Sequence, residues 1–249
     1  MNPKRHPASF TLIEMLVSVA IFSLLVLLLF GLMGGASKLW RRQTAEEESF
    51  REARSALNVL SRDMYGALIS TNTDWFYCNG TNQLAFLTTL PNTAQGSTDA
   101  LGDVCAVGYS LEWGPSETGG PNNMSLYRYV CFSTPTYNNY LLAPTFPIEN
   151  IFVNPDGVNT VRQLIARDIP QVSFTAYTND STGTPWMVPT SELSSMGLLS
   201  NMTINVGITA LNDRMAMQLT TQAQWLTTNS PSILQNEESF TLRVRPQVP

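Results

Sequence analysis

An uncharged stretch near the N-terminus constrains the fold of this chain more than any other feature. The 23 residues from Met15 to Ser37 carry no charged side chain and consist mainly of Leu, Val, Ile, Phe and Met. As a helix that rises about 1.5 Å per residue, they span roughly 34 Å, which exceeds the bilayer's hydrocarbon thickness of about 30 Å. The pattern predicts a helix that crosses a membrane.

A cleaved secretory signal peptide is the competing interpretation, because a basic region precedes the apolar residues. The stretch is longer than the apolar region of a signal peptide, and no cleavage site of the A-x-A kind occurs before Lys38. The sequence therefore favours a retained membrane helix. Charge counting does not orient it, since basic residues flank both of its sides: Lys4 and Arg5, then Lys38, Arg41 and Arg42.

One carboxylate, Glu14, lies inside the apolar block that begins at Phe10. An acid at the centre of a membrane helix costs about 2.5 to 3.5 kcal/mol on insertion scales, so such a residue usually has a partner or a function. The alternative is that Glu14 lies at the level of the lipid headgroups, where the cost is small. Position alone leaves both interpretations open.

The string Phe10-Thr11-Leu12-Ile13-Glu14, with a basic leader before it and an apolar stretch after it, resembles the N-terminal signature of type IV pilins and type II secretion pseudopilins. In those families a prepilin peptidase cuts before the phenylalanine and methylates the new amino group, which implies processing between Ser9 and Phe10. The family glutamate pairs with the N-terminal amine of a neighbouring subunit, which implies an assembly role for Glu14. The chain departs from the family pattern at Ser9, where glycine is usual.

The resemblance also implies a layout and a location. It gives a cytoplasmic leader over residues 1–9, the transmembrane half of a helix over 10–37, an amphipathic half over 38–70 and an antiparallel β head over 71–249. The implied location is the bacterial inner membrane, crossed once, with the head in the periplasm and the protein in a filament after assembly. The implied partners are other pilin or pseudopilin subunits, the prepilin peptidase, the inner-membrane assembly platform and membrane lipid.

The segment after the apolar stretch is expected to continue as one helix, since no proline occurs between Pro7 and Pro91. Its apolar residues recur in steps of three or four and form one helical stripe: Phe50, Ala53, Leu57, Leu60, Met64 and Leu68. The opposite face is polar and is expected to include Arg62 and Asp63. The stripe is short for a coiled coil, which favours packing against the chain's own sheet. The helix is expected to end between Leu68 and Asn72.

Beyond Asn72, short segments of alternating polarity between turns predict strands. They are Leu84–Leu90, Cys105–Trp113, Met124–Phe132, Gln171–Thr178, Met202–Ala210 and Phe240–Arg245. One buried face per strand predicts an antiparallel sheet covered on one side by the helical stripe. The expected fold class is α+β and pilin-like, with a long N-terminal helix packed on an antiparallel β-sheet head.

The expected strands Cys105–Trp113 and Met124–Phe132 are joined by the Gly- and Pro-rich loop Gly114–Asn123. Together they are similar to a β-hairpin of J-type minor pseudopilins. The run Phe50–Leu57 and the strand near Ile204 resemble the pilin-like Verru_Chthon cassette C proteins. The chain is also larger than many major pilin subunits, and a loop-rich head would hinder dense packing along a shaft, which by analogy suggests a low-copy or tip subunit.

The three cysteines, Cys78, Cys105 and Cys131, match no C-x-x-C metal or redox motif. In the expected hairpin, Cys105 and Cys131 fall near facing positions and are candidates for a disulfide in an oxidising compartment. A shift of the strand register by one residue would instead place them on opposite faces of the sheet. The sequence leaves both arrangements open.

The chain has no histidine or lysine beyond position 38, which excludes several kinds of catalytic and metal-binding chemistry there. His6 is the single histidine, and Lys4 and Lys38 are the only lysines. Nucleophiles activated by histidine or lysine and histidine-ligated metals are therefore excluded from the head, and we expect no catalytic residue, metal or cofactor. From residue 70 onward the chain has six arginines against thirteen acids, so nucleic acid is not expected as a partner.

A processed structural subunit of a pilus or secretion filament is the first interpretation of function. The second is an adhesin or binding module at a filament tip, with the loop Gly114–Asn123 or the segment Tyr177–Thr190 as its contact surface. The third is a membrane-anchored enzyme that acts through two carboxylates held in a cleft. No pair of acids in the sequence points to the third.

Overall fold

The structure is a computed structural model. It describes residues 12–68, 75–79, 82–91, 101–116, 119, 121–142, 147–153, 160–179, 184–189, 192, 202–227 and 237–244, without the side chains of 38–39, 41–49, 179, 185, 213–214 and 237–244. The chain forms two compact units, Met1–Thr44 and Ala45–Pro249. The first helix contributes to both units, so each unit is described separately.

Helix α1 (Leu12–Tyr65) is an α-helix of 54 residues. It ends at Tyr65, before the expected range of Leu68–Asn72, because the chain turns at Gly66 to meet strand β2 (Gln83–Thr89). A Cβ atom on Gly66 would lie 2.8 Å from the Thr88 hydroxyl, so a side chain at this position would obstruct the contact. The Gly66 carbonyl accepts a hydrogen bond from the amide of Thr89 at 2.9 Å.

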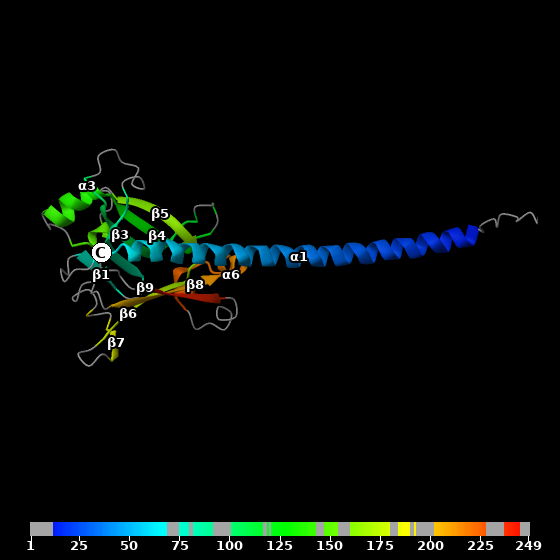
Figure 1. The fold of residues 1–249 in the computed structure, drawn as a ribbon. Helices are drawn as coiled ribbons and strands as arrows, with labels where there is room; N and C mark the ends of the chain where they lie inside the picture. Colours follow the sequence, from blue (N-terminus) through cyan, green and yellow to red (C-terminus); the bar gives the residue numbers. More distant parts are fainter. Residues whose placement is uncertain are drawn as a thin grey trace, which may run out of the picture. The chain divides into compact units, whose positions relative to one another are not determined.

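Two antiparallel sheets form the second unit, and Figure 1 shows them gathered at the cyan, C-terminal end of α1. The first sheet has the order β1-β2-β3-β4-β5, with β1 Phe76–Cys78, β3 Val104–Gly114, β4 Asn123–Cys131 and β5 Thr160–Arg167. The second has the order β7-β6-β8-β9, with β6 Gln171–Asn179, β7 Pro185–Val188, β8 Thr203–Leu211 and β9 Glu237–Val244. This arrangement confirms the expected α+β class.

All six strands expected from the alternation of polarity are present. The hairpin of β3 and β4 is also confirmed, with Tyr109 opposite Arg128. In β8 the expected inward residues Ile204, Val206 and Ile208 have no exposed surface. The sequence did not predict β1, β5 and β7, and it predicted one sheet where the structure has two.

The larger core lies where both sheets meet the amphipathic part of α1. Ala53, Leu60 and Met64 of the predicted stripe are fully buried in it, together with apolar residues of β2, β3, β4, β6 and β8. Full burial of one Leu or Met side chain stabilises the fold by about 1.5 to 3 kcal/mol. Leu68, the last residue of the predicted stripe, lies past the end of the helix and packs against a second core.

The second core covers the opposite face of the first sheet. Its lid is the segment that follows β4, made of α3 (Ser133–Thr136), the π-helix η2 (Tyr137–Leu142) and α4 (Asn150–Val153). Tyr140 and Ile151 from this lid pack against Ala106 and Tyr129 of the sheet. The expectation of a sheet covered on one side only is therefore wrong for the first sheet. Strand β4 is buried along its whole length for this reason.

A glycine in β3 lets the lid come close to the sheet. A Cβ atom on Gly108 would lie 2.7 Å from the ring of Phe152, which packs edge-on against Tyr129 with ring centroids 5.4 Å apart. We predict that Gly108→Ala lowers the free energy of unfolding by about 1 to 3 kcal/mol, because the ring must leave its position.

Urea unfolding of the full chain in detergent measures this effect. Gly114→Ala is the matched control in the same strand, since a Cβ atom there meets nothing within 4 Å. A loss of stability of the same size in both variants would contradict the close approach at Gly108.

Candidate functional site

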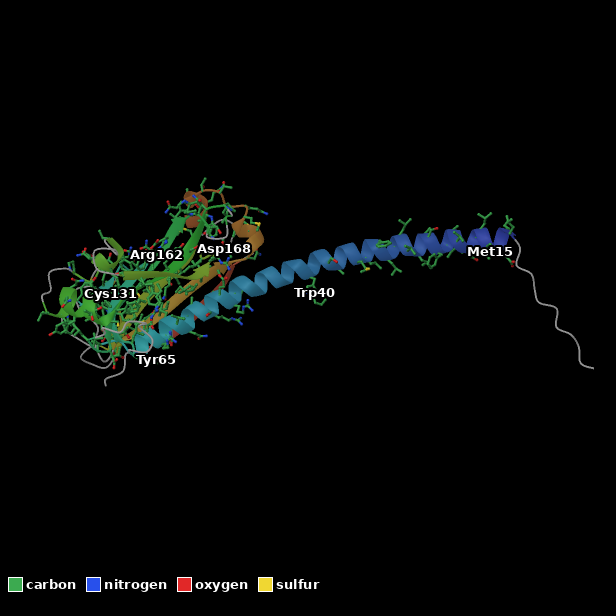
Figure 2. All side chains as sticks on the ribbon, turned by 90° about the horizontal axis from the view of Figure 1, so that it is seen from above. Met15, Trp40, Tyr65, Cys131, Arg162 and Asp168 are labelled. Carbon is green, nitrogen blue, oxygen red and sulfur yellow. The ribbon has the colours of Figure 1, made fainter. Side chains whose placement is uncertain are left out.

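The first 26 residues of α1, Leu12–Ser37, contain an 18-residue window with a mean hydropathy of 2.8 and no buried part. By length and composition this segment is able to cross a membrane. Its large apolar side chains point in all directions around the helix, and those from Leu12 to Val19 are 51–81% exposed. Figure 2 shows them projecting from the helix between the labelled Met15 and Trp40. A helix that is apolar on every side requires lipid or other helices around it.

Glu14 lies in the first turn of α1 and is exposed. A carboxylate near a helix N-terminus is stabilised by the partial positive charge of that end. The Glu14 backbone carbonyl accepts a hydrogen bond from the Ser18 hydroxyl at 2.7 Å, and Ser23 donates to the Val19 carbonyl at 2.8 Å. Because these hydroxyls bond within the helix, they add little cost in an apolar environment.

The two residues of the expected processing site, Ser9 and Phe10, lie outside the described residues. Processing between them stays a prediction. Of the expected N-terminal site, the structure thus gives the position of Glu14 only.

A second polar site, in the head, holds α1 against the first sheet. The Asp63 side chain has no exposed surface, and its Oδ2 accepts hydrogen bonds from Arg128 Nε and from the Tyr109 hydroxyl, each at 2.6 Å. The placement of Asp63 on the polar face of the helix was therefore wrong. Asp63 follows the buried Leu60 by three positions, so helical spacing places it on the same stripe.

The charges of this site are set by their surroundings. Burial lowers the pKa of Arg128, but the hydrogen bond and charge of Asp63 outweigh that effect and leave the pKa raised. Burial, followed by the charge of Asp63, raises the pKa of Tyr109 well above its ordinary value. Arg128 therefore stays charged and Tyr109 stays a donor. Asp63 Oδ1 is buried and accepts no hydrogen bond from the described residues.

Two further carboxylates of this unit also pair with arginines. Glu52 of α1 binds Arg167 at the end of β5, at 2.5 Å, and Glu112 binds Arg162 at 2.7 Å. The guanidinium of Arg162 also lies 3.5 Å from the centre of the Tyr127 ring. In the described part of the chain, no group of three or more His, Cys, Asp or Glu side chains is placed to hold a metal ion.

The hairpin register decides the geometry of the two candidate cysteines. Cys131 lies opposite Ala106, whose side chain belongs to the second core, whereas Cys105 is one position away and points to the other face. Both cysteines are buried and neither is in a disulfide, so the bond that the hairpin allowed is not formed in this structure. Burial raises the pKa of Cys105 to about 12 and that of Cys131 to about 11. Thiols with such pKa values are inert near neutral pH.

Sequence reasoning missed the Asp63 site because it assigned acids to the outer face of the helix by residue type. The available signal was position, since Asp63 falls three residues after Leu60 and seven after the buried Ala56. Tyr109 and Arg128 carried no separate signal, because they become neighbours only through the pairing of β3 with β4.

We predict that Asp63→Asn lowers the free energy of unfolding by about 3 kcal/mol, because Arg128 then keeps a buried charge without its counter-ion. Thermal unfolding of the full chain in detergent measures the change. Glu112→Gln is the control, since its ion pair is partly exposed and such pairs contribute about 0 to 1 kcal/mol.

The double variant Asp63→Leu with Arg128→Met separates charge from packing. Because both charges are then absent, stability should recover part of what Asp63→Asn loses, less the about 1 to 3 kcal/mol that the buried Tyr109 hydroxyl costs without its acceptor. A double variant less stable than Asp63→Asn would show that shape, rather than charge, governs this contact.

Comparison with known families concerns the N-terminus. Residues 4–30 match the family described as the prokaryotic N-terminal methylation motif. The matched range contains Ser9, Phe10 and Glu14 and most of the apolar segment of α1. The match supports a type IV pilin-like or pseudopilin family and a prepilin-type subunit anchored in a membrane. No curated protein and no solved structure matches the chain.

Proposed function

We propose that this chain is a minor pilin or pseudopilin, cut by a prepilin peptidase between Ser9 and Phe10 and assembled into a type IV pilus or type II secretion-like filament. The observation that carries the proposal is the N-terminal methylation motif continuing directly into a helix that is apolar and exposed on all sides. Such a helix is stable in lipid before assembly and among neighbouring helices after it. The chain is then a structural subunit.

The role proposed for Glu14 follows from its charge and position. Cleavage before Phe10 creates a new amine four residues from Glu14. An amine of one subunit and the Glu14 carboxylate of the next form a compensated ion pair, whereas either charge alone is costly in an apolar environment. Glu14 would thereby select and register the incoming subunit.

The location follows from the same proposal. The leader faces the cytoplasm, α1 crosses the inner membrane, and the head lies in the periplasm beside the assembly platform. The hairpin of β3 and β4 agrees with the proposed likeness to J-type minor pseudopilins. We also propose that the chain is related to the Verru_Chthon cassette C proteins.

The first test is mass spectrometry of the mature protein from cells that contain a prepilin peptidase. We expect a chain that begins at N-methylated Phe10, and a peptidase-deficient strain as the control should retain the leader. An intact Met1 in both strains, or a chain cut after residue 37, would rule out the proposed processing.

The second test addresses Glu14. We predict that Glu14→Ala enters the membrane as well as the unchanged protein, since an acid is removed, but reduces the sheared filament fraction by about tenfold or more, as expected for an ion pair of roughly 1.4 kcal/mol. Glu14→Asp keeps the charge and should retain part of the assembly. Ser18→Ala, a polar deletion one turn further along, is the matched control. Normal assembly of Glu14→Ala would remove the role proposed for this residue.

A filament-tip binding module is the second candidate. It is favoured by the hairpin of β6 and β7, within the segment expected to make contacts, where Trp186 is 42% and Met187 56% exposed. Binding of the purified protein to a glycan or surface protein without other subunits would support it. The membrane-anchored carboxylate enzyme has no comparable support, since Glu52, Asp63 and Glu112 each pair with an arginine.

A further inference from the structure

Trp40 and three basic residues follow directly after the apolar segment of α1. Lys38, Arg41 and Arg42 are separated by three and four positions, so they fall on one side of the helix. Trp40 lies between them in the sequence, two positions from Lys38 and two from Arg42, and therefore on the other side of the helix. It is 76% exposed, and Figure 2 shows its side chain projecting from the helix. We refer to residues 38–42 as the juxtamembrane cluster.

The length of the helix places this cluster at a membrane surface. Glu14 and Lys38 are 24 positions apart, which corresponds to about 36 Å of helix, whereas the hydrocarbon layer is about 30 Å thick. When residues 15–37 fill the hydrocarbon, the juxtamembrane cluster falls in a headgroup layer. Tryptophan prefers that layer because its ring is apolar and its N–H is polar.

The head is acidic and does not itself attract an anionic membrane surface, so the juxtamembrane cluster has to supply that attraction. From residue 70 onward the chain has an excess of seven acids, and Arg128, Arg162 and Arg167 each bind a carboxylate. An anionic lipid surface therefore repels the head. The cations at positions 38, 41 and 42 lie beside the membrane segment on the side from which the chain continues to the head. Each Lys or Arg near an anionic surface strengthens binding by roughly fivefold.

We propose that the juxtamembrane cluster binds the headgroups of anionic phospholipids in the leaflet next to the head and so fixes the depth of α1. The inference rests on the membrane insertion in the proposed function. A second copy of the chain is the other partner with matching charge, through Glu46, Glu47 and Glu48. Lipid is favoured, because an exposed tryptophan fits a headgroup layer and gains nothing from a row of carboxylates.

The test uses the full chain in vesicles of phosphatidylcholine with phosphatidylglycerol. A small fraction of one lipid carries pyrene on its acyl chain, and energy transfer from tryptophan gives the relative association of the two lipids. Trp40→Phe identifies the share of the signal that comes from Trp40. We expect phosphatidylglycerol to be favoured about tenfold near Trp40, and the preference to fall at 1 M salt, where the screening length is about 3 Å.

Charge variants identify the residues responsible. The variant K38Q/R41Q/R42Q should lose the preference, whereas K38R/R41K/R42K should keep it because the charges remain. The matched control R51Q/R54Q/R62Q removes three exposed cations further along α1 and should also keep it. Circular dichroism verifies that each variant is folded.

The inference is overturned if the wild-type protein shows no preference, or if K38Q/R41Q/R42Q retains it. It is also overturned if that variant abolishes cross-linking between copies in pure phosphatidylcholine, since the cluster would then bind a second copy. Release of the wild-type protein from vesicles by alkaline carbonate would contradict membrane insertion and thus the proposed function as well. Stable insertion without a lipid preference contradicts the present inference alone.

Discussion

The carboxylate of Asp63 lies where helix α1 meets β3 and β4, and it accepts hydrogen bonds from both strands. Apolar packing by itself is tolerant of sliding, because Ala, Leu and Met side chains of a stripe fit more than one register. A buried charge is not tolerant, since any other register leaves either Asp63 or Arg128 without its counter-ion. The ion pair therefore fixes the rotation and the axial position of the helix on the first sheet. The pair Glu52–Arg167, three turns earlier along the helix, adds a second point of attachment.

The N-terminal apolar helix was predictable from sequence because its signal is local. Twenty-three uncharged residues and a single Glu14 are properties of one continuous segment, and helical geometry alone converts them into a span with an acid at one end. The Asp63 site was not predictable in this way, because Tyr109 and Arg128 lie 46 and 65 positions after Asp63 in the sequence. Cys105 and Cys131 lie between these cases. The hairpin was read correctly, but one residue of register separates the faces on which the thiols lie.

The same contrast applies to the fold. Strand β8 shows strict alternation and was placed correctly, since its small or polar residues are less deeply buried. Strand β5 has two arginines and several exposed side chains, so its pattern is that of a polar loop, and it is a strand because β4 supplies its hydrogen bonds. The second core was missed for a related reason. Its lid is made of short helices rich in Tyr, Asn and Thr, without the apolar periodicity that identifies a covering helix.

The turn at Gly66 also has a mechanical meaning. Directly after α1, the backbone bonds to β2 through Gly66–Thr89 and Leu68–Leu87, and the Thr88 hydroxyl binds the Asp63 carbonyl. Tension carried along α1 is therefore passed to an inner strand of the sheet before it reaches the chain that leads to β1. If the chain is pulled along α1, these hydrogen bonds and the Asp63–Arg128 pair bear the force together, in parallel. The strength of the subunit under pulling would then depend on this short junction more than on the size of either core.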